Sequence, residues 1–273
     1  MAQIITLSNQ KGGVGKTMTT IHLGIGMARQ GKRVLLIDAD PQGTMTHNLG
    51  FRPIGDLKIT LATVLERTAR QSPMKPDEGL LHHKEGVDLM PSNIQLSGME
   101  RDLTVSGNKR VLSRYLETVK SRYDYILIDC MPSLGAITLN CFTAADSVII
   151  PMQAQPEATL GLHQLMQTIH NVRKGLNPRL RIDGILLTMV EERTSIAKLV
   201  TQQVREAFGS NPKVFENYIP KNVALWDTGI MGKSIYAHES KSKSALAYEA
   251  FTKEVLDGGN REKDSRPRND FLR

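Results

Sequence analysis

A glycine-rich segment with two lysines, at residues 11–17, constrains the fold of this chain more than any other feature. It has the sequence K-G-G-V-G-K-T and lies between an apolar run at residues 4–8 and an amphipathic segment at residues 16–29. In a strand–loop–helix unit, glycines let backbone N–H groups surround phosphate oxygens, and the helix N-terminus adds a favourable potential. The sequence therefore predicts a phosphate-binding loop formed by Lys11, Gly12, Gly13, Val14, Gly15, Lys16, Thr17 and Met18.

Two side chains of this loop have the chemistry that a nucleotide requires. Lys16 is placed to reach the β- and γ-phosphates, and the hydroxyl of Thr17 is placed to bind Mg²⁺. A glycine-rich turn without a ligand is the alternative interpretation. We set it aside because strand, loop and helix all fall where phosphate binding needs them.

The rest of the chain alternates short apolar runs with amphipathic segments. The apolar runs lack polar alternation, which is typical of parallel strands covered on both faces. Predicted strands are residues 4–8, 33–37, 125–128, 147–152 and 185–189. Predicted helices are residues 16–29, 61–68, 109–120, 135–144, 158–174, 197–208 and 244–256. This order predicts an α/β fold with a doubly wound, mostly parallel sheet and helices on both faces.

The domain organisation is predicted to be simple. Residues 1–257 read as one nucleotide-binding domain, because neither a repeat nor a linker interrupts the α/β order. Residues 71–86 are polar and predict a loop or a weak hairpin. Gly258 and Gly259 are expected to end the last helix, and residues 258–273 then form a polar, charged tail that we expect to be disordered.

Carboxylates follow two of the predicted strands. Asp38 and Asp40 belong to the segment D-A-D-P-Q after the second strand, and Asp129 ends the apolar run at residues 125–128. The carboxyl ends of parallel strands meet at the edge where such sheets bind ligands. A carboxylate there can hold Mg²⁺, directly or through water, or orient an attacking water molecule. We therefore predict metal-site roles for Thr17, Asp38, Asp40 and Asp129, with the alternative that any one carboxylate is a helix cap or loop charge.

Composition excludes several classes of protein. The chain has 273 residues with a formal net charge of +7, which favours polyanionic partners: nucleotide phosphates, nucleic acid or an acidic membrane surface. The two cysteines, Cys130 and Cys141, are too few for a disulfide framework and indicate a reducing cytoplasm. Neither a membrane-spanning apolar run nor a signal peptide is evident, so we expect a cytoplasmic protein.

The loop departs from the usual phosphate-loop pattern G-x-x-x-x-G-K-[ST] in an informative way. Gln10 replaces the first glycine, and Lys11 supplies an additional lysine. With D-A-D-P-Q and D-C-M-P-S-L-G (residues 129–135), the chain resembles the deviant-Walker-A ATPases, which include ParA and Soj, MinD and the nitrogenase iron protein. The resemblance implies ATP and Mg²⁺ as cofactors and an ATP-dependent homodimer in which Lys11 contacts the partner's nucleotide. It also implies catalytic roles for Lys11, Lys16, Asp40 and Asp129, with Asp40 positioning the attacking water.

Later motifs narrow the resemblance to partition ATPases of the ParA/Soj type. The segment I-P-K-N-V (residues 219–223) resembles the family's adenine-flanking segment, so Pro220, Lys221 and Asn222 are implied to contact the base. A turn or helix cap is the alternative role for Asn222. The chain departs from the family pattern at three positions. Met18 stands where a second threonine is common, Met131 replaces a proline, and Ala224 stands where an arginine is common. Trp226, the only tryptophan, marks either a partner surface or a buried packing position.

Members of this family act in DNA partition, at membrane surfaces or in redox chemistry, and the sequence favours DNA partition. Nonspecific DNA binding needs basic residues, and we expect contacts from Arg205, Lys213, Lys221 and Lys233. A ParB-like centromere-binding partner and nucleoid association are implied with it. The alternative is a MinD-like or cargo-positioning ATPase at a membrane surface or on a protein cargo. Pro267 and the polar C-terminal segment disfavour a membrane-binding helix, and two cysteines without flanking glycines disfavour a redox cluster.

Overall fold

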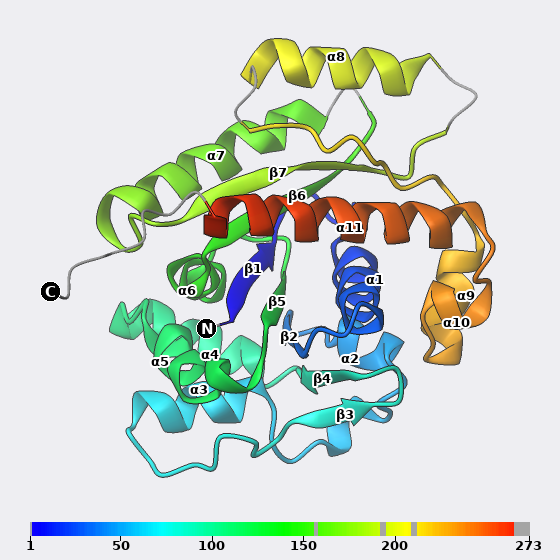
Figure 1. Cartoon of the computed structure of the whole chain (residues 1–273). Helices are drawn as coiled ribbons and strands as arrows, with labels where there is room; N and C mark the ends of the chain where they lie inside the picture. Colours follow the sequence, from blue (N-terminus) through cyan, green and yellow to red (C-terminus); the bar gives the residue numbers. More distant parts are fainter. Residues whose placement is uncertain (1, 156–157, 192–194, 209–211, 265–273) are drawn as a thin grey trace, which may run out of the picture.

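The fold is built on one seven-stranded sheet with the order β3-β4-β2-β5-β1-β6-β7 (Figure 1). It is seen in a computed structural model that describes residues 2–155, 158–191, 195–208 and 212–264. All neighbouring strands are parallel except β3 and β4, which confirms the predicted doubly wound, mostly parallel sheet. The strands are β1 (Gln3–Leu7), β2 (Val34–Ala39), β3 (Leu81–His83), β4 (Val87–Met90), β5 (Tyr125–Cys130), β6 (Ser147–Gln153) and β7 (Arg181–Thr188).

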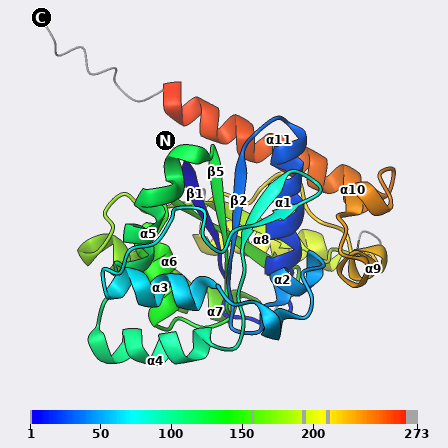
Figure 2. The ribbon, with the colours of Figure 1, turned by 90° about the horizontal axis from the view of Figure 1, so that it is seen from below.

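Helices cover both faces of this sheet. Seen from below, α3, α4 and α5 lie on one side of the sheet, and α1 and α11 lie on the other (Figure 2). The helices are α1 (Lys16–Arg29), α2 (Thr44–Asn48), α3 (Leu61–Ala69), α4 (Leu96–Ser106), α5 (Val111–Val119), α6 (Ala136–Ala144), α7 (Ala158–Gly175), α8 (Ile196–Phe208), α9 (Ala224–Met231), α10 (Ile235–His238) and α11 (Lys243–Asp264), with short 3-10 turns at Ile54–Asp56 and Lys120–Arg122. Among the described helices, none combines the length and the apolar character that crossing a bilayer requires.

The central strands are apolar on both faces because each face packs against helices. Leu35 and Ile37 of β2 contribute to the core beneath α3, α5 and α6, whereas Leu36 points into the core beneath α1 and α11. All six residues of β2 and of β5 are buried. Burial of both faces explains why these strands lack the polar alternation of a half-exposed sheet.

Some boundaries differ from the sequence predictions. Residues 71–86 include β3, which pairs antiparallel with β4, so the hairpin interpretation is correct for the end of that segment. The predicted end of the last helix at Gly258 and Gly259 is wrong, because α11 continues to Asp264. Two glycines do not outweigh a helix that is already anchored by buried Tyr248, Phe251 and Val255. Residues 265–273 of the predicted tail lie outside the described residues.

Candidate functional site

The phosphate loop connects the end of β1 to the start of α1. Gly13 and Gly15 have φ angles of 71° and 81°, in the left-handed region that favours glycine, and Gly15 is the N-cap of α1. A Cβ atom added at Gly12 or Gly13 would meet nothing within 4 Å. The loop therefore has the backbone turns and the open space that an anion at a helix N-terminus requires.

Side chains from neighbouring strand ends hold this loop by its carbonyl groups. The hydroxyl of Thr188 donates to the carbonyl of Val14 at 2.8 Å, and the Gln153 amide donates to the carbonyl of Gly13 at 3.0 Å. The Asn9 side chain accepts a hydrogen bond from the backbone N–H of Lys11 at 3.0 Å. Because the C=O and N–H of a trans peptide point in opposite directions, holding the carbonyls orients the N–H groups away from the strands. Sequence reasoning missed Gln153 and Thr188, which belong to no motif.

The two loop lysines have different surroundings. The ammonium of Lys16 lies 3.3 Å from the carbonyl of Lys11, and only 8% of the Lys16 surface is exposed. This burial lowers the pKa of Lys16, while nearby Asp129 acts in the opposite direction. The half-buried Lys11 instead donates to the side chain of Gln155 at 2.9 Å. Lys16 is thus turned toward the inside of the phosphate loop, and Lys11 toward the segment that follows β6.

Asp38 and Asp129 lie side by side at the carboxyl edge of the sheet. They occupy paired positions on β2 and β5, and both are fully buried. Burial and the neighbouring Asp38 raise the pKa of Asp129 to about 8, against the lowering effects of a hydrogen bond from Thr17 and the charge of Lys16. Burial likewise raises the pKa of Asp38 to about 6, against the lowering effect of its hydrogen bonds from Thr46.

The contacts of Asp38 and Asp40 assign them different roles. One oxygen of Asp38 accepts hydrogen bonds from the backbone and hydroxyl of Thr46, at 2.8 and 2.7 Å. Asp40 is only half-buried, and it accepts a hydrogen bond from the backbone N–H of Gln42 at 2.9 Å. Asp38 is therefore held inside the structure by α2, whereas Asp40 is partly exposed to solvent. Thr46 is a further site residue that no motif indicated.

The donor set fits a divalent cation beside a phosphate group. Two adjacent buried carboxylates repel each other, and a cation relieves both that repulsion and the cost of burial. Mg²⁺ is usually held by one or two carboxylates, with water and phosphate oxygens completing its coordination. Within the described ranges, no three His, Cys, Asp or Glu side chains form a metal-binding group. Thr17 and Asp129 are already joined by a hydrogen bond, and they are the most suitable pair of Mg²⁺ ligands in the site.

The predicted adenine segment lies at the same edge of the sheet. The N–H of Val190 donates to the carbonyl of Ile219, and the N–H of Lys221 donates to the carbonyl of Val190, both at 3.0 Å. This pairing places the buried Pro220 next to the end of β7, where Thr188 also contacts the phosphate loop.

Asn222 forms a turn just before α9, which is the alternative role that the sequence left open. Its side-chain oxygen accepts a hydrogen bond from the backbone N–H of Ala224 at 3.0 Å, at the start of α9. The ammonium of Lys221 is paired with Glu191 at 2.7 Å. The structure therefore brings residues 220–222 to the edge of the sheet that carries the phosphate loop, with the Asn222 oxygen already engaged by a backbone N–H.

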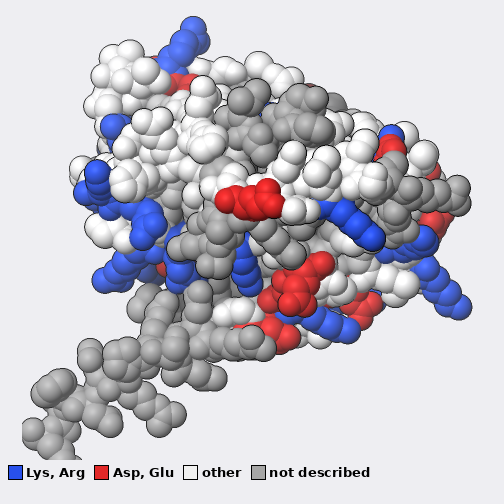
Figure 3. Space-filling view, turned by 90° about the horizontal axis from the view of Figure 1, so that it is seen from above, with Lys and Arg blue, Asp and Glu red and all other residues white. Residues whose placement is uncertain are grey.

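The predicted DNA contacts are dispersed. Lys213, Lys221 and Lys233, which we call the C-terminal basic surface, are all exposed. Lys213 lies over the ring of Phe215, with its ammonium 4.9 Å from the ring centroid. The side chain of Arg205 lies outside the described residues, although its backbone belongs to α8. On the face seen from above, lysines and arginines form separate groups with acidic side chains between them (Figure 3).

Trp226 is on the surface, so the buried packing position is the wrong alternative. It is 73% exposed on α9, close to the exposed Val223 and Ile230. The opposite side of α9 packs on α2, where the side chain of Asn48 lies against Gly229.

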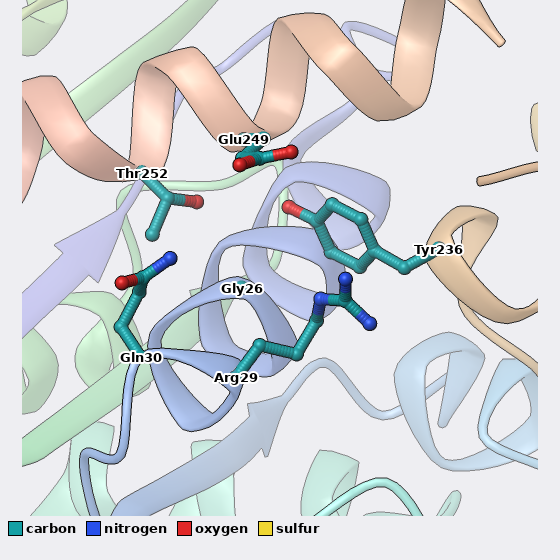
Figure 4. Close-up of a pocket in the computed structure, with 6 residues that line it drawn as sticks. All are labelled: Gly26, Arg29, Gln30, Tyr236, Glu249 and Thr252. Carbon is teal, nitrogen blue, oxygen red and sulfur yellow. The ribbon is translucent and has the colours of Figure 1, made fainter. Parts of the chain in front are cut away.

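A cavity lined by residues of α1, α10 and α11 is separate from the phosphate loop. It has a volume of about 310 Å³ and is lined by Gly26, Arg29, Gln30, Tyr236, Glu249 and Thr252 (Figure 4). Gly26 lies near the C-terminal end of α1, about 15 Å along the helix axis from Lys16. The nucleotide chemistry is therefore assigned to the open phosphate loop, where the buried charges lie, and not to this cavity.

Comparisons with known proteins agree with this geometry. A family model described as an AAA domain matches residues 2–182. The chain is 41% identical over 266 residues to the sporulation initiation inhibitor protein Soj of Bacillus subtilis, covering 95% of this chain and 100% of the relative. It is 40% identical over 265 residues to the chromosome partitioning protein ParA of Caulobacter vibrioides, covering 96% of each. The structure of cobyrinic acid a,c-diamide synthase from Mycobacterium smegmatis, with bound ADP and magnesium, aligns with a TM-score of 0.83 and 34% identity over 97% of both chains.

Proposed function

The chain belongs to the ParA/Soj family of partition ATPases, and we propose that it uses ATP hydrolysis to segregate DNA. The reaction is the conversion of ATP and water to ADP and phosphate. Two relatives are about 40% identical to this chain over nearly their full length. One is named Soj, and the other is named as the chromosome partitioning protein ParA. The relative named as a cobyrinic acid synthase is less similar in sequence, at 34% identity. The function that best fits the chain is therefore partition.

The observation that carries this proposal is the convergence of Lys16, Asp38 and Asp129 beside the phosphate loop. Lys16 is buried next to Asp129, and Asp129 is paired with Asp38 across β2 and β5. The backbone of residues 12–17 would hold the phosphates, and Thr17 with Asp129 would hold Mg²⁺, with Asp38 supporting them. Bound Mg²⁺ neutralises negative charge on the phosphate oxygens during transfer.

Two residues complete the proposed chemistry. Asp40 is half-buried at the open side of the edge, where it would orient the attacking water. Lys11 would leave Gln155 and contact the nucleotide of a second subunit, which makes dimerisation depend on ATP. A cation supplied by a partner stabilises the charge of a transferring phosphoryl group in the same way as an arginine finger. Pro220, Lys221 and Asn222 would border the adenine, with Asn222 offering its amide N–H groups.

In this proposal, the ATP-bound homodimer binds DNA nonspecifically, and ATP hydrolysis returns it to the monomer. Arg205 together with the C-terminal basic surface, Lys213, Lys221 and Lys233, would contact DNA phosphates. Such a dimer would be cytoplasmic and associated with the nucleoid, and a ParB-like partner would stimulate hydrolysis. The exposure of the three lysines supports their contribution.

The test is DNA binding by the purified protein with ATP, with ADP and without nucleotide, at two salt concentrations. We expect binding with ATP only, weakened at the higher salt concentration because released counterions drive association. A Lys11→Ala variant is the control, since it should bind ATP but remain monomeric and fail to bind DNA. Equal DNA binding with and without ATP would contradict the proposal.

A further inference from the structure

Glu100, in the middle of α4, contacts the segment that follows Asp129. Its two carboxylate oxygens accept hydrogen bonds from the backbone N–H groups of Ala136 and Ile137, each at 2.7 Å. These are the first two residues of α6, whose N–H groups have no partner within the helix. One carboxylate from another helix therefore caps α6, and its negative charge also suits the positive end of the helix dipole.

The sequence of the α6 N-terminus is adapted to this contact. Gly135 immediately precedes α6, and a Cβ atom added there would overlap with the carboxylate of Glu100. The φ angle of Gly135 is −76°, which any residue can adopt. Glycine is thus needed here for the space that the carboxylate occupies, and not for backbone freedom.

The other end of α4 is connected to the second buried carboxylate. The backbone N–H of Ser92, just before α4, donates to the hydroxyl of Thr46 at 3.0 Å. That hydroxyl in turn donates to Asp38 at 2.7 Å. Through Ser92 and Glu100, α4 and its leading segment therefore contact the chain that follows β2 and the chain that follows β5.

We propose that Glu100 is a positioning residue for ATP hydrolysis, a role that rests on the proposed function. By fixing the start of α6, Glu100 sets the path of residues 131–135, the short segment between Asp129 and that helix. Through α4 and the Ser92–Thr46 hydrogen bond, the start of α6 is also connected to Asp38. Glu100 contacts neither the phosphate loop nor its lysines, so it acts on the step of hydrolysis more than on nucleotide affinity.

The test replaces Glu100 with glutamine in the full chain. Glutamine retains the shape, but its amide nitrogen cannot accept a hydrogen bond, so Ala136 or Ile137 loses its partner. We expect kcat for ATP hydrolysis to fall about tenfold or more, with the Kd for a non-hydrolysable ATP analogue changed less than about threefold. Hydrogen exchange of residues 136–140 should accelerate by about tenfold or more, because their cap is lost.

Two further variants make the result decisive. Asp102→Asn, an exposed acid on the same helix, removes the same charge and should leave kcat unchanged. Gly135→Ala displaces the carboxylate from the other side and should reproduce the loss of kcat seen with Glu100→Gln. The inference is overturned if Glu100→Gln hydrolyses ATP at the wild-type rate, or if it loses analogue binding in proportion to kcat. Failure of the wild-type protein to hydrolyse ATP would instead contradict the proposed function.

Discussion

The phosphate loop with Asp38 and Asp129 differs from the C-terminal basic surface in how firmly its side chains are held. Around the loop, Lys16 contacts the loop backbone, Asp38 accepts two hydrogen bonds from Thr46, and both carboxylates are fully buried. On the basic surface, Lys213 packs over the ring of Phe215 and Lys221 forms an ion pair with Glu191, and both lysines are exposed.

This difference shows how much a single residue can contribute in each region. A buried charge acts through strong, short-range interactions, and no solvent replaces a missing partner. An exposed lysine is screened by salt, and its contribution to binding a polyanion is one of several similar terms. We therefore expect large, specific effects from substitutions at the loop and small, graded effects from substitutions on the basic surface.

The largest effect is expected from Lys16→Ala. Removing the ammonium leaves the phosphates without their main cation and leaves Asp129 without its nearby positive charge. ATP affinity measured by calorimetry should fall about 100-fold or more, consistent with loss of a buried charge-assisted contact. Lys58→Ala, at an exposed lysine outside the site, should bind ATP normally. Tight ATP binding by Lys16→Ala would remove the distinction between the two regions.

Asp129→Asn should separate stability from activity. The pKa of Asp129 is raised from 3.8 to about 8 by burial, so the folded state binds its proton more tightly than the unfolded state does. The ionised carboxyl group therefore costs little stability near pH 4. The cost increases as the pH rises and is complete above about pH 8.

Denaturant unfolding without nucleotide tests this expectation at several pH values. Asp129→Asn should stabilise the protein by roughly 1–3 kcal/mol at pH 8.5 and have little effect near pH 4. The same variant should lose ATP hydrolysis, because the amide is a poor ligand for Mg²⁺. If Asp129→Asn is less stable than the wild type at pH 8.5, then the ionised Asp129 carboxylate does not destabilise the folded protein.

The smallest effect is expected from Lys213→Gln. Loss of one phosphate contact should weaken DNA binding a few-fold and reduce the slope of log K against log salt by about 1. Lys58→Gln is the matched control, since it removes the same charge outside the C-terminal third of the chain. An unchanged salt slope for Lys213→Gln would exclude Lys213 from the DNA-binding surface.

Features set by local patterns could be predicted from the sequence. The bounds of α1 are those predicted, because the glycines before it and its apolar spacing mark both ends. The sequence did not predict β4, α2, α4, α9 or α10, because these segments depend on tertiary contacts more than on their own periodicity. His22 carried no signal either, although it is fully buried and accepts a hydrogen bond from the backbone of Ile235 at 2.9 Å.

The sequence by itself determined the phosphate loop, the strand ends that bear Asp38 and Asp129, and the family of the chain. These features depend on consecutive residues, whose spacing is fixed by the covalent chain. Only the tertiary structure decided that Thr188 and Gln153 hold the loop and that Glu100 caps α6. Such contacts join residues far apart in the chain, and a sequence contains no local pattern for partners that meet only when the sheet and its helices pack.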